Sequence, residues 1–139
     1  MPQELANVAP VQVSAIGEAR FTAEARLEGT TMAVRMEGTA DAKAKPHFQS
    51  FFERVHRSSI ESRVGDAVVD VQRLAFMSSS CFKDVLVWIM NVNAEPAEAR
   101  YRIRFVPDPK RGWQKRGFRA LVLMAPELVS IDEIGGTRP

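Results

Sequence analysis

The sequence predicts a single α/β domain built on a mixed β-sheet, and three patterns support this fold class. Two early segments alternate apolar and polar residues at period two, as half-buried strands do. Three later segments place apolar residues at helical spacing, and short strand-like runs separate them. The expected order is ββαβαβαβ. Strand-helix-strand steps imply parallel strands, whereas the opening hairpin must be antiparallel.

Length and composition fit one domain. The chain has 139 residues, of which 45% are hydrophobic, and its formal charge is +2. We expect a tail or edge segment at 1–17, the domain at 18–134 and a flexible end at 135–139. Because the small net charge creates no global field, neither a membrane nor a nucleic-acid partner is expected.

The compartment is expected to be the cytoplasm. Cys81 is the only cysteine, so no internal disulfide can form, which fits a reducing environment. The first residues lack the charged and apolar regions of a secretory signal. The longest apolar run, residues 85–90, is far shorter than the roughly 20 residues that cross a bilayer.

The opening hairpin comes from two alternating runs. Apolar residues occupy every second position in each run: Phe21, Ala23, Ala25 and Leu27, then Met32, Val34 and Met36. Between the runs, Glu28-Gly29-Thr30 forms a plausible turn, and Gly38 ends the second strand.

A first helix and a buried strand follow. Pro46 precedes an apolar stripe at i, i+3, i+4 and i+7, made of Phe48, Phe51, Phe52 and Val55. The β-branched run 67–71 predicts a central strand covered on both faces. The sheet therefore receives its third strand here.

The second half of the chain repeats this alternation. A second helix is marked by Phe82, Val85, Leu86 and Ile89, and a fourth strand by Tyr101, Ile103 and Phe105. The third helix has an expected stripe of Trp113, Gly117, Ala120, Leu121 and Met124. Pro126 ends that helix before a last short strand at 128–131.

The serine cluster Ser78-Ser79-Ser80 stands where a strand ends and the second helix begins. One serine can cap the helix, because its oxygen accepts a backbone N–H that lacks a partner in the first turn. The free N–H groups and the helix dipole also favour a phosphate there. Both the capping role and a functional role stay open on these residues alone.

The serine segment resembles the strand-and-switch motif of STAS domains, the anti-sigma factor antagonist family. That motif reads apolar-apolar-Asp, then aromatic-x-Asp-Ser-Ser-Gly-Leu. It is similar to Val68-Val69-Asp70 followed by Phe76-Met77-Ser78-Ser79-Ser80-Cys81-Phe82. Here Ser78 stands in place of the Asp and Cys81 in place of the Gly. The resemblance extends from about Phe21 to Ile134.

The resemblance implies a site and a switch. In the family the first serine after the acidic position is phosphorylated by a partner kinase, and Ser79 aligns with it; Ser78 and Ser80 are secondary candidates. It implies a partner-binding face made of Asp41, Ser78, Ser79, Ser80, Cys81 and Lys83. Asp41 also has a simpler interpretation as a turn residue before the first helix.

The function implied is that of a non-enzymatic bacterial signalling regulator, without a cofactor. Its expected partner is an anti-sigma factor or a serine/threonine kinase-like protein, and phosphate would act by repulsion and desolvation at the interface. The alternative is an assembly subunit that scaffolds a regulatory complex as a homo-oligomer, which exposed apolar residues would support.

Other chemistries find little support. His47 and His56 are nine residues apart, on opposite sides of the first helix, so one metal cannot bridge them there. No nucleophile, base and acid occur at a recognised spacing. For Cys81 a buried position is preferred over a reactive thiol. The basic run between Lys110 and Arg119 suits a solvated face better than nucleic-acid binding.

Overall fold

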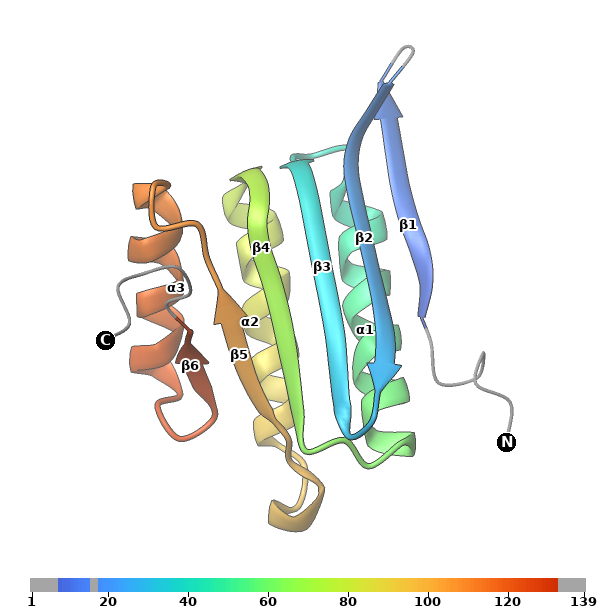
Figure 1. Ribbon diagram of the computed structural model, residues 1–139, viewed down its shortest axis with the longest axis vertical. Helices are drawn as coiled ribbons and strands as arrows, with labels where there is room; N and C mark the ends of the chain where they lie inside the picture. The colour runs from blue at the N-terminus through green and yellow to red at the C-terminus, as the bar shows by residue number, and fades with distance from the viewer. Residues whose placement is uncertain (1–7, 16–17, 133–139) are drawn as a thin grey trace.

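The computed structural model describes residues 8–15 and 18–132, which form one six-stranded mixed sheet with helices (Figure 1). The strands are β1 (Val8–Ala15), β2 (Glu18–Glu28), β3 (Thr31–Ala40), β4 (Asp66–Met77), β5 (Arg102–Val106) and β6 (Val129–Ile131). The helices are α1 (Lys45–Glu61), α2 (Ser79–Asn93) and α3 (Gly112–Met124), with a 3₁₀ turn at η2 (Ala97–Ala99).

Strand order follows chain order from β1 to β6. The pairs β1/β2 and β2/β3 are antiparallel, and the pairs from β3 to β6 are parallel. The predicted mixed α/β sheet with an antiparallel hairpin is confirmed. The structure adds β1, an edge strand drawn from the segment that the sequence assigned to a tail or an edge.

All three helices belong to one face of the sheet. Each parallel crossover steps one strand in the same direction, and right-handed crossovers taken in one direction place their helices on the same side. Figure 1 shows α1 and α2 behind the sheet. The burial of β2 and β3 alternates accordingly, with Phe21, Ala23, Met32 and Val34 buried and the intervening residues more exposed.

This one-sided arrangement corrects the expectation for the third strand. In β4, Ala67, Val69 and Val71 are buried against the helices, whereas Val68 and Asp70 on the opposite face are only half-buried. The β-branched composition predicted the strand correctly. Because no crossover reverses direction, the second face of β4 receives no helix cover.

The core lies between the sheet and the helices. The predicted stripe of α1 is confirmed: Phe48, Phe51, Phe52 and Val55 are all buried. Aromatic rings link α1 to α2, with the centroids of Phe52 and Trp88 4.7 Å apart. Large aromatic side chains bury much apolar area, so this contact contributes strongly to helix docking.

The stripe expected for α3 is displaced around the helix. The buried residues are Gln114, Phe118 and Leu121, whereas Met124 is 62% exposed. Gln114 is polar but belongs in the core, because its amide nitrogen donates to the carbonyl oxygens of Val71 (2.7 Å) and Leu74 (2.9 Å). These carbonyls lie where the β3/β4 register shifts, and the bonds satisfy them.

Candidate functional site

The candidate site lies at the sheet edge where β3 and β4 both end. The two strands are parallel and pair up to Ala40 and Met77, so the segments that follow them are adjacent. The Ser78 amide donates to the Ala40 carbonyl oxygen at 2.8 Å, which joins the two corners. This is the upper end of the molecule in Figure 1.

Gly38 sets the path of β3 into this corner. Its φ is +93°, and a Cβ at this position would collide with the backbone carbonyl oxygen of Arg20 on β2. Only glycine combines that conformation with that close approach. The strand continues past Gly38 to Ala40, two residues beyond the predicted end.

Ser78 is the N-cap of α2. Its backbone is extended (φ −68°, ψ 161°), and its hydroxyl oxygen accepts the Cys81 N–H at 3.2 Å. A cap of this kind typically contributes about 1 kcal/mol. The predicted capping serine is confirmed, and the bond commits the Ser78 hydroxyl to the fold.

Ser79 and Ser80 occupy the first turn of α2 and are exposed. Within the described residues, neither hydroxyl has a side-chain hydrogen bond. The N–H groups at the start of a helix have no intrahelical acceptor, and the dipole is positive there. Of the three serines, these two are thus free to be modified without loss of the cap.

The Asp41 carboxylate contacts one backbone amide nearby in the chain and one arginine side chain on β2. Oδ1 accepts the Lys43 N–H at 3.1 Å, and Oδ2 is 3.2 Å from Nη1 of Arg20. The first bond is the turn-residue role that the sequence allowed. The carboxylate is 28% exposed and so remains accessible at the rim.

Cys81 lies beneath this surface. Its side chain is 0% exposed, and its thiol donates to the Asp41 carbonyl oxygen at 3.7 Å. Burial raises the pKa of the Cys81 thiol, which opposes thiolate formation. The preferred buried role is confirmed, and the inclusion of Cys81 among partner-contacting residues is wrong. It supports the corner from below.

An ion pair that the sequence did not reveal joins α1 to α2 beside the serines. Lys45 Nζ lies 3.0 Å from Oδ1 and 2.9 Å from Oδ2 of Asp84. Asp84 is 8% exposed and sits one turn after Ser80, whereas Lys83 points to solvent. No sequence pattern signals this pair, because its partners are 39 residues apart.

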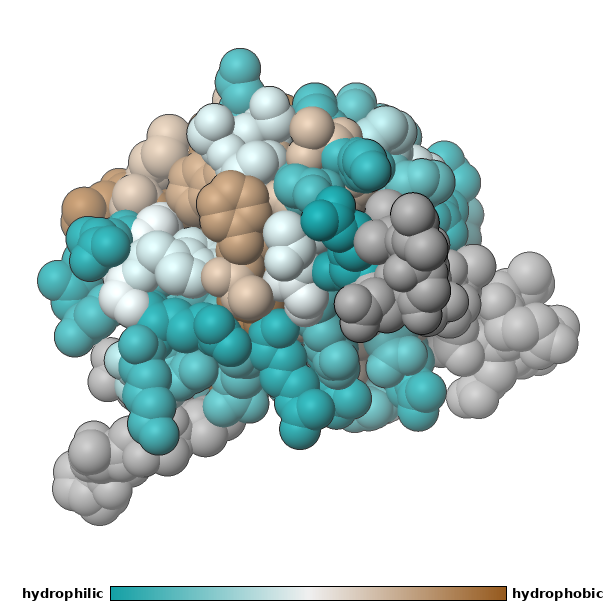
Figure 2. All heavy atoms as spheres, turned by 90° about the horizontal axis from the view of Figure 1, so that it is seen from above, coloured by the Kyte–Doolittle hydropathy of each residue, from teal (hydrophilic) through white to brown (hydrophobic). Residues whose placement is uncertain are grey.

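The surface around the serines is mixed in character. Figure 2 views this end from above and shows apolar residues at its centre with hydrophilic ones around them. Phe76, the residue before Met77 in β4, is 49% exposed. Aromatic residues are enriched at protein-binding surfaces, so the exposed Phe76 ring is the feature of this end that best suits a protein partner.

A second polar cluster joins α1 and α2 to Tyr101, and it reaches from the buried Trp88 to the partly exposed Glu95. Tyr101 Oη accepts the Trp88 indole N–H at 2.9 Å and lies 2.8 Å from Nδ1 of His56. His56 Nε2 is 2.9 Å from Glu95 Oε2. Because the partners of His56 lie 39 and 45 residues away in the chain, no local sequence pattern reveals this network, which joins α1 and α2 to the residue just before β5. Among the described residues, no group of His, Cys, Asp or Glu side chains forms a metal site.

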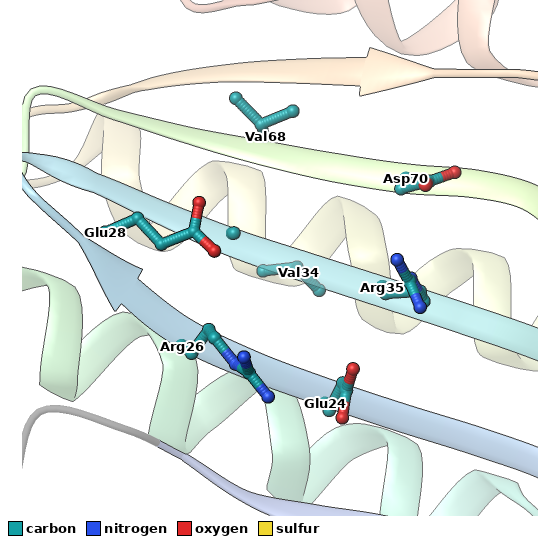
Figure 3. A pocket seen from close by; sticks show the side chains of 8 residues that line it. Glu24, Arg26, Glu28, Val34, Arg35, Val68 and Asp70 are labelled. Carbon is teal, nitrogen blue, oxygen red and sulfur yellow. The ribbon is translucent and has the colours of Figure 1, made fainter. Parts of the chain in front are cut away.

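The open face of the sheet carries a depression of about 410 Å³ (Figure 3). Charged side chains of β2, β3 and β4 line it, and register places Glu24, Arg35 and Asp70 in one row across the strands. Neither Asp41 nor Ser79 contributes to it. The serine corner and this depression are therefore separate features.

Solved structures of other proteins share the fold, and three of them are compared with this chain. An anti-sigma factor antagonist from Mycobacterium paratuberculosis has a TM-score of 0.59 and 13% identity, over 82% of this chain and 87% of that one. For SpoIIAA, an anti-sigma factor antagonist in its unphosphorylated form, the TM-score is 0.51 and the identity is 17%, over 77% of this chain and 83% of that one. For the Bacillus cell fate determinant SpoIIAA in the phosphorylated form, the TM-score is 0.53 and the identity is 18%, over 81% of this chain and 92% of that one.

The likeness to these proteins is one of fold. No protein-family model and no curated protein matches the sequence. The chain thus has the STAS fold of anti-sigma factor antagonists, and the predicted resemblance is confirmed at that level. No helix among the described residues is long and apolar enough to cross a membrane.

Proposed function

We propose that the protein is a non-enzymatic signalling regulator that binds an anti-sigma factor or a serine kinase through the corner surface. This surface comprises Asp41, Ser78, Ser79, Ser80 and Lys83. One observation carries the proposal: in a STAS fold, Ser79 is an exposed, unbonded hydroxyl on the first turn of α2.

Phosphorylation of Ser79 is the proposed switch. A phosphoryl group adds about −1.5 to −2 charges. Free N–H groups of the first turn and Lys83, four residues along the same helix, favour that charge within the molecule. A docked partner would instead face an extra dianion and its desolvation cost. Phosphate therefore changes binding while leaving the fold intact.

The capping bond explains why Ser79 is preferred over Ser78. Modifying the Ser78 hydroxyl would disturb the bond that it accepts from the Cys81 N–H. Ser80 is exposed like Ser79 and stays a secondary acceptor.

The experiment has two stages. A photo-crosslinking amino acid replaces Ser79 in cells of the source organism, with the same replacement at Arg102 on the open sheet face as the matched control. A partner captured from position 79 alone is then purified and incubated with the wild-type protein and ATP. Mass spectrometry should locate phosphate on Ser79, and Ser79→Ala should abolish it.

The outcomes separate binding from switching. If all three serines stay unmodified with a captured kinase, the switch is wrong but the binding role stands. If position 79 captures only proteins without a kinase or sigma-regulating activity, the regulatory function itself is refuted.

The exposed apolar residues of α2 favour one second candidate, an assembly subunit. Val87 and Met90 are 50% and 60% exposed on the same helix as the serines. A self-associating surface of this kind gives a mass that rises with concentration in light scattering. A constant monomer mass over a wide concentration range would rule this candidate out.

A further inference from the structure

The segment that contains helix α3 has a local excess of positive charge, which the small net charge of +2 for the whole chain does not reveal. Between Asp108 and Glu127 the sequence contains five cationic residues and no carboxylate. Arg111 is paired with Asp108 at 3.3 Å. The other four are exposed, and no described carboxylate lies within 4.0 Å of them: Lys110, Lys115, Arg116 and Arg119.

The outward face of α3 consists of two adjacent rows at i, i+4 spacing. One row is Lys115, Arg119, Leu123, and the other is Arg116, Ala120, Met124; all six are exposed. We name these six residues the α3 outer face. Each row begins with a cation and ends with a large apolar side chain, over a helix of 13 residues.

The apolar ends are unusually accessible. Leu123 is 75% exposed and Met124 is 62% exposed, adjacent in the last turn. The opposite side of the helix carries the buried residues Gln114, Phe118 and Leu121. The outer face is therefore free of the domain's own packing.

We infer that the α3 outer face binds the surface of an anionic lipid bilayer, an interaction independent of the function proposed for the serine corner. Charge complementarity selects this partner, because the three unpaired cations of the face, with Lys110 just before the helix, suit anionic headgroups. Leu123 and Met124 also favour a bilayer as the partner. Their side chains can enter the acyl boundary, while lysine and arginine side chains reach back to the headgroups.

Nucleic acid fits this face less well. Phosphate contacts use the cations but leave Leu123 and Met124 exposed to water. The concavities that the described residues form on the open sheet face and around α1 are lined by other elements. A convex helix face with flexible side chains suits a fluid bilayer, whereas tight protein partners need shape complementarity.

The test measures sedimentation of the full-length protein with vesicles. The probes are phosphatidylcholine vesicles with and without about 30% phosphatidylglycerol, at about 0.05 M and about 0.5 M sodium chloride. We expect binding only with phosphatidylglycerol, and its loss at the higher salt. Arg116→Gln/Arg119→Gln should weaken binding about 25-fold, since each cation contributes about fivefold, or about 1 kcal/mol.

Two further variants make the test specific. Leu123→Gln/Met124→Gln should weaken vesicle binding about tenfold, because it removes apolar surface that the lipid would bury. Arg57→Gln/Arg102→Gln removes the same charge from exposed positions of α1 and β5 and should change binding less than about twofold. Circular dichroism checks that each variant is folded.

Three results would overturn the inference. The first is no sedimentation with anionic vesicles at low salt. The second is an equal loss in the Arg57→Gln/Arg102→Gln control, which would indicate a response to net charge alone. The third is that Leu123→Gln/Met124→Gln keeps full binding while a DNA duplex binds as tightly as the vesicles, which would identify a general polyanion site.

Discussion

Removing the Tyr101 hydroxyl should destabilise the domain through two partners at once. The oxygen accepts the indole N–H of Trp88, which is 1% exposed, and contacts Nδ1 of His56. In Tyr101→Phe the Trp88 donor is buried without an acceptor, which costs about 1–3 kcal/mol. The His56 side chain is 16% exposed, so water can replace part of its bond. We expect a total loss of about 2–4 kcal/mol in the free energy of unfolding.

The pH dependence of that loss tests the reasoning further. Burial raises the pKa of Tyr101 above its usual value. Above about pH 10 the unfolded tyrosine loses its proton while the folded one keeps it, so wild-type stability falls by about 1.4 kcal/mol per pH unit. Phenylalanine has no such proton. The difference between wild type and Tyr101→Phe should therefore shrink between pH 10 and 11, with the full difference present below pH 9.

Urea denaturation followed by tryptophan fluorescence measures both effects, and the chain has no second tyrosine to confuse them. Thr22→Val is the matched control: it removes a half-buried hydroxyl from the open sheet face and should change stability by less than about 0.5 kcal/mol. A Tyr101→Phe loss no larger than the control, or a difference that stays constant up to pH 11, would refute this account of the network.

Three other changes have defined outcomes. Gly38→Ala should cost more than about 2 kcal/mol in urea denaturation, because it combines positive φ with a backbone collision; a neutral result would contradict the close approach. Asp84→Asn should cost about 1–3 kcal/mol, since Lys45 loses a partner that is 8% exposed, and salt should reduce the loss only slightly. Cys81 should react with a thiol reagent far more slowly in the native state than in urea, and equal rates would contradict its burial.

Local pattern made much of this fold predictable. Period-two alternation identified β2 and β3, and the i, i+3, i+4, i+7 spacing identified the buried stripe of α1, because both signals depend only on neighbouring residues. The N-cap at the start of α2 was predictable for the same reason: a serine before a helix has a local partner three residues ahead.

What the sequence left open depends on residues distant in the chain. Whether β4 is covered on one face or two follows from the direction of successive crossovers, and the face that α3 buries follows from Gln114 meeting the carbonyls of β4. At the serine corner, the residue types and the position of the cluster came from the sequence alone. Only the tertiary structure decided that Cys81 lies beneath the surface while Ser79 lies upon it, because exposure is set by the segments that pack around a residue.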